Sequence, residues 1–89
     1  MFGDITMRFK AEIKVMLKPG HSDPEGETTA RALRELNYPV EGVNVSKVYA
    51  VYLEETSQIE ARKTADEMCR RLLANPTKDD YLIEIRETE

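Results

Sequence analysis

The stretch Met7–Leu17 alternates between two kinds of side chain, and this alternation constrains the fold more than any other feature of the chain. One set is apolar: Phe9, Ala11, Ile13, Val15 and Leu17. The other set is mostly charged: Arg8, Lys10, Glu12, Lys14 and Met16. Because successive side chains of a strand point to opposite faces, this period of two predicts a half-buried strand. Lys18-Pro19-Gly20 ends it, since Pro and Gly both break strand pairing.

A helix is predicted next, with Asp23 as its N-cap and Pro24 as its first residue. Its expected apolar stripe follows helical spacing and consists of Thr29, Ala32, Leu33 and Leu36. Gly26 is unusual in the first turn, because glycine costs about 1 kcal/mol relative to alanine inside a helix. We interpret it as a position that permits close approach of another backbone. Asn37-Tyr38-Pro39 ends the helix, since a residue before proline avoids the α region.

The segment from Val40 to Glu55 is rich in β-branched and aromatic residues, which favour strands. Tyr49, Val51 and Leu53 share one face with Val43 and Val45. No two-residue glycine turn divides the segment, so it predicts one long strand, bent or bulged near Ser46-Lys47. Such a strand would extend past its neighbours, and its overhang could pair with another subunit.

A second helix is predicted to follow a cap at Thr56 or Ser57. Its buried stripe is expected to comprise Ala61, Ala65, Met68, Cys69, Leu72 and Leu73. Asn75 is expected to end this helix in the left-handed conformation, and Pro76 prevents its continuation. Tyr81, Ile83 and Ile85 then alternate with polar neighbours as a last strand.

The predicted order is strand, helix, strand, helix, strand. Short connections and alternating strand faces predict an α+β fold, with a small, mainly antiparallel sheet and two helices packed on one of its faces. We expect a single domain over residues 7–89, preceded by a flexible extension at residues 1–6. Because 89 residues bury only a modest core, association with another chain would add useful buried area.

Charge and composition disfavour two classes of partner. Thirteen basic and 17 acidic residues give a net charge of −4, which disfavours nucleic-acid binding because that binding relies on basic residues. No apolar run approaches the ~20 residues needed to span a bilayer, so no membrane association is expected. The chain has one cysteine and no secretion signal at its start, which favours the cytoplasm.

The residues show no catalytic centre. Cys69 lies on the apolar helix stripe and is interpreted as a buried structural thiol, and His21, the one histidine, as a loop residue. Metal-ligand clusters and phosphate-binding glycine motifs are both lacking in the sequence. Lys47 is the one charge in the buried phase of the long strand, where two readings stay open. It reaches solvent with its head, or it meets a carboxylate or phosphate.

Several short motifs together resemble the PurS family, the small subunit of phosphoribosylformylglycinamidine synthase. They are Lys14 to Leu17, Asp23-Pro24-Glu25-Gly26, Val43-Asn44-Val45-Ser46-Lys47, Met68 to Pro76, and Asp80-Tyr81. The resemblance covers nearly all of residues 7–87. Where the family strand usually carries an Arg-x-Gly-Lys run, this chain has Asn44 and Ser46 in place of the arginine and glycine, while Lys47 matches.

The resemblance implies a role in purine biosynthesis. The family's complex converts formylglycinamide ribonucleotide, glutamine and ATP into formylglycinamidine ribonucleotide (FGAM), and the small subunit bridges a glutaminase subunit and a synthetase subunit. It implies homodimers or larger assemblies, help with ammonia passage, no catalytic residue in this chain and no bound cofactor, ATP and Mg being used by the synthetase subunit. The partner and interface candidates are Asp23, Pro24, Gly26, Lys47, Asn75, Asp80 and Tyr81.

Two other classes share the predicted architecture. A free-standing ferredoxin-like or ACT-like module would bind a small effector and need no glutaminase. A small RNA-binding α+β domain is disfavoured by the acidic charge and by the lack of a stripe of basic and aromatic residues. A neighbouring gene for a glutaminase or synthetase subunit would separate the PurS-like subunit from the free-standing effector-binding module.

Overall fold

The structure is a computed structural model, and it describes residues 5–89. Its elements are β1 (Met7–Leu17), α1 (Pro24–Glu35), β2 (Lys47–Glu55), α2 (Gln58–Met68), a π-helical turn η1 (Cys69–Leu73) and β3 (Asp79–Thr88). The strands form one antiparallel sheet in the order β2-β1-β3. The α+β class, the element order and the antiparallel sheet are therefore as predicted.

β1 is the central strand and carries most of the core. Phe9, Ala11 and Ile13 are fully buried on one face. Ile13 lies opposite Tyr49 of β2 and Ile83 of β3 in the strand register, so one apolar face continues across all three strands. Both the alternation in β1 and the phases assigned to β2 and β3 are confirmed.

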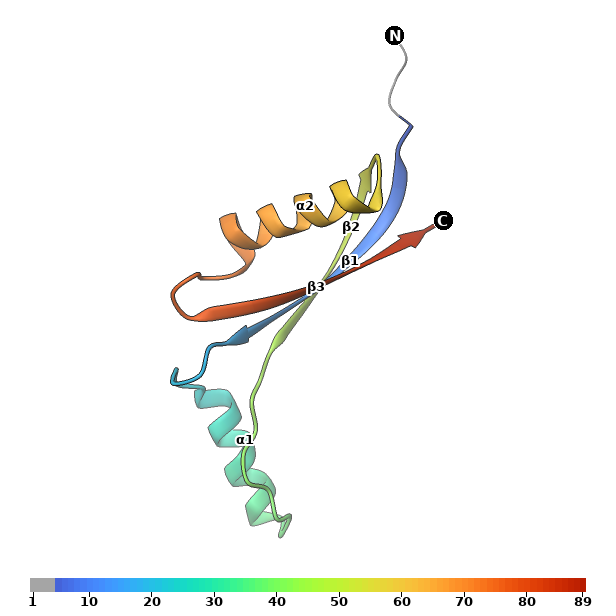
Figure 1. Ribbon diagram of the computed structural model, residues 1–89. Coiled ribbons are helices and arrows are strands. Elements are labelled where there is room, and N and C mark those ends of the chain that lie inside the picture. Colours follow the sequence, from blue (N-terminus) through green and yellow to red (C-terminus); the bar gives the residue numbers. More distant parts are fainter. Residues whose placement is uncertain (1–4) are drawn as a thin grey trace.

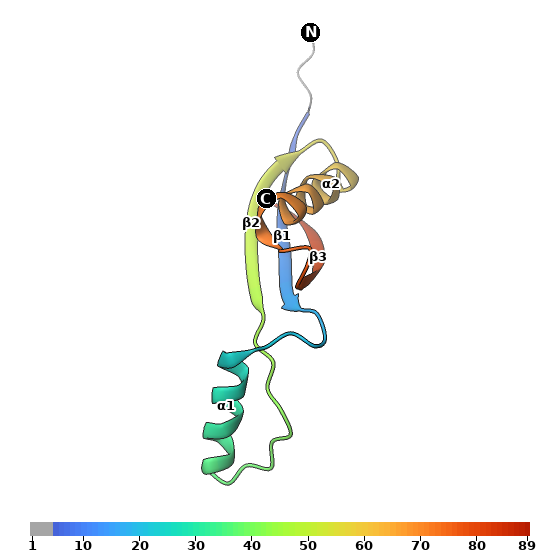
Figure 2. The same cartoon turned by 90° about the vertical axis from the view of Figure 1, so that its left-hand side faces the viewer.

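α2 lies across this apolar face (Figures 1 and 2). It begins at an N-cap, Ser57, whose hydroxyl accepts a hydrogen bond from the Glu60 amide at 3.1 Å. Ala61, Ala65 and Cys69 are fully buried, and these small side chains let the helix lie close to the sheet.

The end of α2 differs from the prediction in two ways. The last turn is a π turn, in which the Ala74 amide bonds the Cys69 carbonyl at 3.0 Å. A π turn holds more residues than an α turn, so Leu72 rotates off the buried stripe and is 83% exposed. Asn75 does not take the left-handed conformation, because Ala74 is already extended there. The Asn75 side chain instead accepts a hydrogen bond from the Thr77 amide at 2.9 Å.

α1 does not pack on the sheet, so the prediction of two helices on one face was wrong for this helix. It projects past the end of the sheet, beside the returning segment 40–46 (Figures 1 and 2). Gly26 and Ala30 are buried and Leu33 is half-buried, whereas Thr29, Ala32 and Leu36 of the predicted stripe are exposed. α1 turns its small residues towards segment 40–46 because Asp23 and Gly26 hold it there, as described below.

We call α1 together with residues 36–46 the arm. The arm makes the molecule elongated, with extents of 64 × 29 × 14 Å. The Cα radius of gyration is 17.7 Å, whereas a compact domain of this length would have about 12 Å. One chain therefore leaves the arm uncovered on its outer side.

The predicted long strand is divided at Lys47. Residues 47–55 pair with β1, whose partner for Lys47 is Val15, and residues 40–46 run on without strand pairing. Of the predicted extension 1–6, residues 1–4 lie outside the described part, and Ile5 and Thr6 precede β1 without regular structure. In the described part of the chain, neither helix is long and apolar enough to cross a bilayer.

Candidate functional site

Asp23 joins the two halves of the arm where it leaves the sheet. One carboxylate oxygen accepts the Gly26 amide at 2.9 Å, which caps α1, and the other accepts the Val45 amide at 2.9 Å. The bond from Val45, and then the bond from Gly26, lower the pKa of the Asp23 carboxyl below its ordinary value. The predicted cap is confirmed, and it also fixes the return segment to the helix.

Gly26 is the position at which α1 and the return segment come closest. A Cβ placed on Gly26 would lie 2.2 Å from the Val43 carbonyl oxygen and 2.6 Å from an Asp23 carboxylate oxygen. No side chain fits into that space without moving backbone. The prediction that this glycine permits close approach of another backbone is therefore confirmed.

Lys47 opens β2 beside this junction. A cavity of about 390 Å³ lies here, lined by Lys47, Asp23 and Pro24 with Lys78 and Asp79 from the turn before β3. Lys47 itself is exposed, and no carboxylate within residues 5–89 forms an ion pair with it. In the single chain its head thus reaches solvent. Whether it meets an anion in a complex stays a prediction.

The remaining candidates lie around the turn between η1 and β3. The Asn75 amide donates to an Asp79 carboxylate oxygen at 2.9 Å, and Asp80 pairs with Lys18 at 3.3 Å. Tyr81 points away from this turn towards α2. The structure therefore divides the candidates into a junction group (Asp23, Pro24, Gly26 and Lys47) and a turn group (Asn75, Asp80 and Tyr81), at one end of the sheet.

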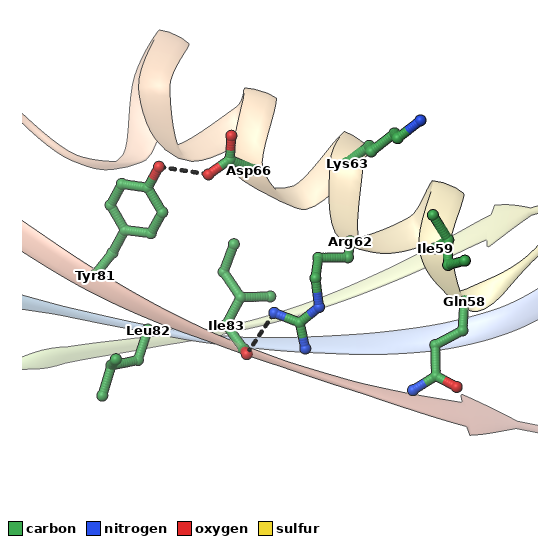
Figure 3. A pocket seen from close by; sticks show the side chains of 8 residues that line it. All are labelled: Gln58, Ile59, Arg62, Lys63, Asp66, Tyr81, Leu82 and Ile83. Carbon is green, nitrogen blue, oxygen red and sulfur yellow. Dashed lines mark hydrogen bonds between the residues drawn. The ribbon is translucent and has the colours of Figure 1, made fainter.

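Sequence reasoning missed a groove between α2 and β3. It has a volume of about 790 Å³ and is lined by Gln58, Ile59, Arg62, Lys63, Asp66, Tyr81, Leu82 and Ile83 (Figure 3). The Tyr81 hydroxyl donates to Asp66 at 2.5 Å, a bond that lowers the pKa of Asp66 and raises that of Tyr81. The available signal was the spacing of Gln58, Arg62 and Asp66, which places all three on one side of α2.

The one cysteine and the one histidine have different environments. Cys69 is fully buried under α2, whereas His21 is exposed in the loop between β1 and α1. Burial, with a smaller contribution from the Asp66 charge, raises the pKa of the Cys69 thiol. Within residues 5–89, no three His, Cys, Asp or Glu side chains are grouped in a way that could hold a metal ion.

We expect the Cys69 thiol to be chemically quiet in the folded protein. It is buried among Ala65 and Ala74, and its raised pKa disfavours the reactive thiolate. A thiol reagent should label the native protein slowly and the unfolded protein rapidly. Rapid labelling of the native protein would contradict this, as would a folded Cys69→Ser variant whose complex with its partner subunits loses activity.

Comparison with known proteins identifies the family. The PurS family model, described as phosphoribosylformylglycinamidine (FGAM) synthase, matches residues 10–87. The chain belongs to the PurS family. A PurS subunit of phosphoribosylformylglycinamidine synthase from Archaeoglobus fulgidus is 44% identical over 78 residues, which cover 86% of this chain and 98% of the relative.

Solved PurS structures have the same fold. PurS from Thermus thermophilus superposes with a TM-score of 0.84 at 35% identity, covering 92% of this chain and 99% of that one. A chain of the PurLQS structure from Thermotoga maritima gives a TM-score of 0.78 at 33% identity, covering 91% and 98%. The match therefore includes the projecting arm as well as the sheet, and this chain corresponds to a PurS chain over nearly its whole length.

Proposed function

We propose that this chain is a non-catalytic bridging subunit of phosphoribosylformylglycinamidine synthase in purine biosynthesis. The complex would form FGAM from formylglycinamide ribonucleotide, glutamine and ATP. This subunit would hold a glutaminase subunit and a synthetase subunit together and assist the transfer of ammonia between them. ATP and Mg would be bound by the synthetase subunit, and the complex would work in the cytoplasm.

One observation carries the proposal beyond family membership, namely the uncovered arm. The radius of gyration of the chain exceeds that of a compact domain by about half, and Leu36 and Tyr38 at the tip of the arm are exposed. A helix that packs only against one extended segment buries too little to be stable alone, so it gains most from a partner. The similar chain in the PurLQS structure from Thermotoga maritima supports a partner protein that covers the arm.

Self-association is part of the proposal. β2 is an edge strand of the sheet with no strand on its outer side, and segment 40–46 leads into it without a strand partner. Unpaired backbone of this kind is a template for another chain. A second copy of the chain would supply that partner, and the joined pair would offer surfaces to two different subunits.

The alternative of a free-standing effector-binding domain is less well supported. The family match over residues 10–87 leaves no part of the domain to be explained by another family. An effector-binding domain would also be expected to enclose its ligand. The larger hollow, the groove between α2 and β3, lies open at the surface, and the junction cavity is lined by mixed charges.

Assembly tests the proposal. Light scattering at micromolar concentration should give a mass above the 10.2 kDa of one chain. Mixed with its glutaminase and synthetase subunits, the chain should elute with both, and the two should elute apart when it is omitted. A clean monomer would contradict the self-association, and three separate peaks would contradict the bridging role.

A further inference from the structure

The sheet has two edges, β2 and β3, and these two edges are finished differently. An edge strand presents unpaired N–H and C=O groups to which any other strand can add. On β3, the Ile83 carbonyl accepts a hydrogen bond from the Arg62 side chain at 3.1 Å (Figure 3). The Ile85 carbonyl accepts one from the Gln58 side chain at 3.3 Å. Side chains of α2 therefore occupy acceptors that a further strand would need.

These bonds belong to a regular ladder. Gln58 bonds Ile85, Arg62 bonds Ile83, and Asp66 bonds Tyr81, so each step is four residues on α2 and two residues on β3. Four helical residues rise about 6 Å and two strand residues about 6.6 Å, so the two spacings match. We call Gln58 and Arg62, the two members that bond the backbone, the edge guard.

The β2 edge has no such cover. Within residues 5–89, no side chain makes a hydrogen bond to the backbone of β2. Val48 and Tyr52 stand beside this edge and are 60% and 71% exposed. Segment 40–46 leads into β2 without a strand partner, but side chains of Arg34 and Asp23 already bond its backbone, so the open edge is β2 itself.

We propose that the edge guard closes β3 to strand addition, so that a second copy of this chain adds at β2 and sheet pairing stops at two copies. A sheet with two open edges can add copies without limit, whereas a sheet with one open edge closes as a pair. The second half of this inference rests on the self-association proposed above. The first half concerns α2 and β3 alone and can fail or hold separately.

The direct test removes both donors in the double variant Gln58→Ala/Arg62→Ala. The matched control is Lys63→Ala, which removes one positive charge from the same helix at a residue whose ion pair is with Glu60 and not with β3. Sedimentation velocity over a range of concentrations should show the natural protein and the control levelling off at the pair. The double variant should form assemblies of more than two copies, and their size should increase with concentration. If all three proteins form assemblies of the same size, Gln58 and Arg62 do not close β3 to strand addition.

A second variant blocks β2. The Ile83 and Ile85 carbonyls bond α2, so the odd-numbered residues of β3 face away from β1 and the even-numbered ones bond even-numbered residues of β1. The odd-numbered residues of β1 therefore bond the odd-numbered residues of β2, and the even-numbered residues of β2 face outward. Ala50→Pro therefore removes an outward N–H and no bond within the sheet. Circular dichroism would check its fold.

Ala50→Pro alone should be a monomer. Ala50→Pro combined with Gln58→Ala/Arg62→Ala should form a pair through β3 and no larger assembly. A natural protein that is already monomeric would refute the proposed self-association. The double variant Gln58→Ala/Arg62→Ala should then still pair through β3. Ala50→Pro that pairs as the natural protein does would overturn the assignment of pairing to β2.

Discussion

Replacing Gly26 with alanine should destabilise the protein, although the same change in an ordinary helix stabilises it. Helix propensity alone predicts a gain of about 1 kcal/mol. Here the new methyl group would sit 2.2 Å from the Val43 carbonyl oxygen, so α1 and the return segment must separate. Overpacking of this kind costs about 1–3 kcal/mol. Denaturant unfolding should show the loss, and the Val45 amide should exchange its hydrogen faster as its bond to Asp23 weakens.

Gly42 provides the matched control for that experiment. It lies on the same return segment, and a Cβ there would meet no atom within 4 Å. Gly42→Ala should therefore change the free energy of unfolding by no more than about 0.5 kcal/mol in the destabilising direction. If both alanine variants behave alike, the close contact at Gly26 does not hold the arm.

Replacing Lys47 with methionine should weaken assembly without weakening the fold. The side chain is exposed at the start of β2, so the variant should stay folded and oligomeric, with an unchanged or higher melting temperature. If a synthetase carboxylate meets this ammonium, affinity for the synthetase should fall by about 1.5–3 kcal/mol, or roughly 10- to 150-fold. Excess variant should restore glutamine-dependent turnover, because mass action refills a weakened bridge.

Lys78→Met is the control for Lys47, since Lys78 lines the same cavity and lies outside the motif shared with the PurS family. It should leave affinity for the synthetase close to that of the natural protein. Turnover that stays low at saturating Lys47→Met would place Lys47 in ammonia transfer instead of assembly. Unchanged affinity and turnover would make it an ordinary solvent-exposed lysine.

The sheet could be predicted from the sequence because its information is local. Alternation in β1 sets which of its faces is buried. The residues of β2 and β3 that lie opposite a buried β1 residue point to the same face. Gly26 could be predicted for a similar reason, since a glycine in the first turn of a helix costs stability unless it permits a contact. The Asp23 cap followed from residue type and from Pro24 next to it.

The position of α1 could not be predicted in this way. A helical stripe such as Thr29, Ala32 and Leu36 indicates that a face is apolar, but it does not say whether that face meets the same chain or another one. Leu72 and Asn75 were misplaced because one π turn shifts every later residue around the helix axis, and no residue type marks such a turn. The α2–β3 ladder depends on how a helix and a strand are placed side by side, with bonded residues 15 to 27 positions apart in sequence.

Turnover with two nitrogen sources tests the bridging role most directly. FGAM formation would be measured with the synthetase and glutaminase subunits, with and without this chain, using either glutamine or free ammonia. A bridge predicts that omitting the chain abolishes glutamine-dependent turnover and leaves ammonia-dependent turnover intact, since ammonia reaches the synthetase without a glutaminase. Glutamine-dependent turnover that persists at the same rate without the chain would contradict it.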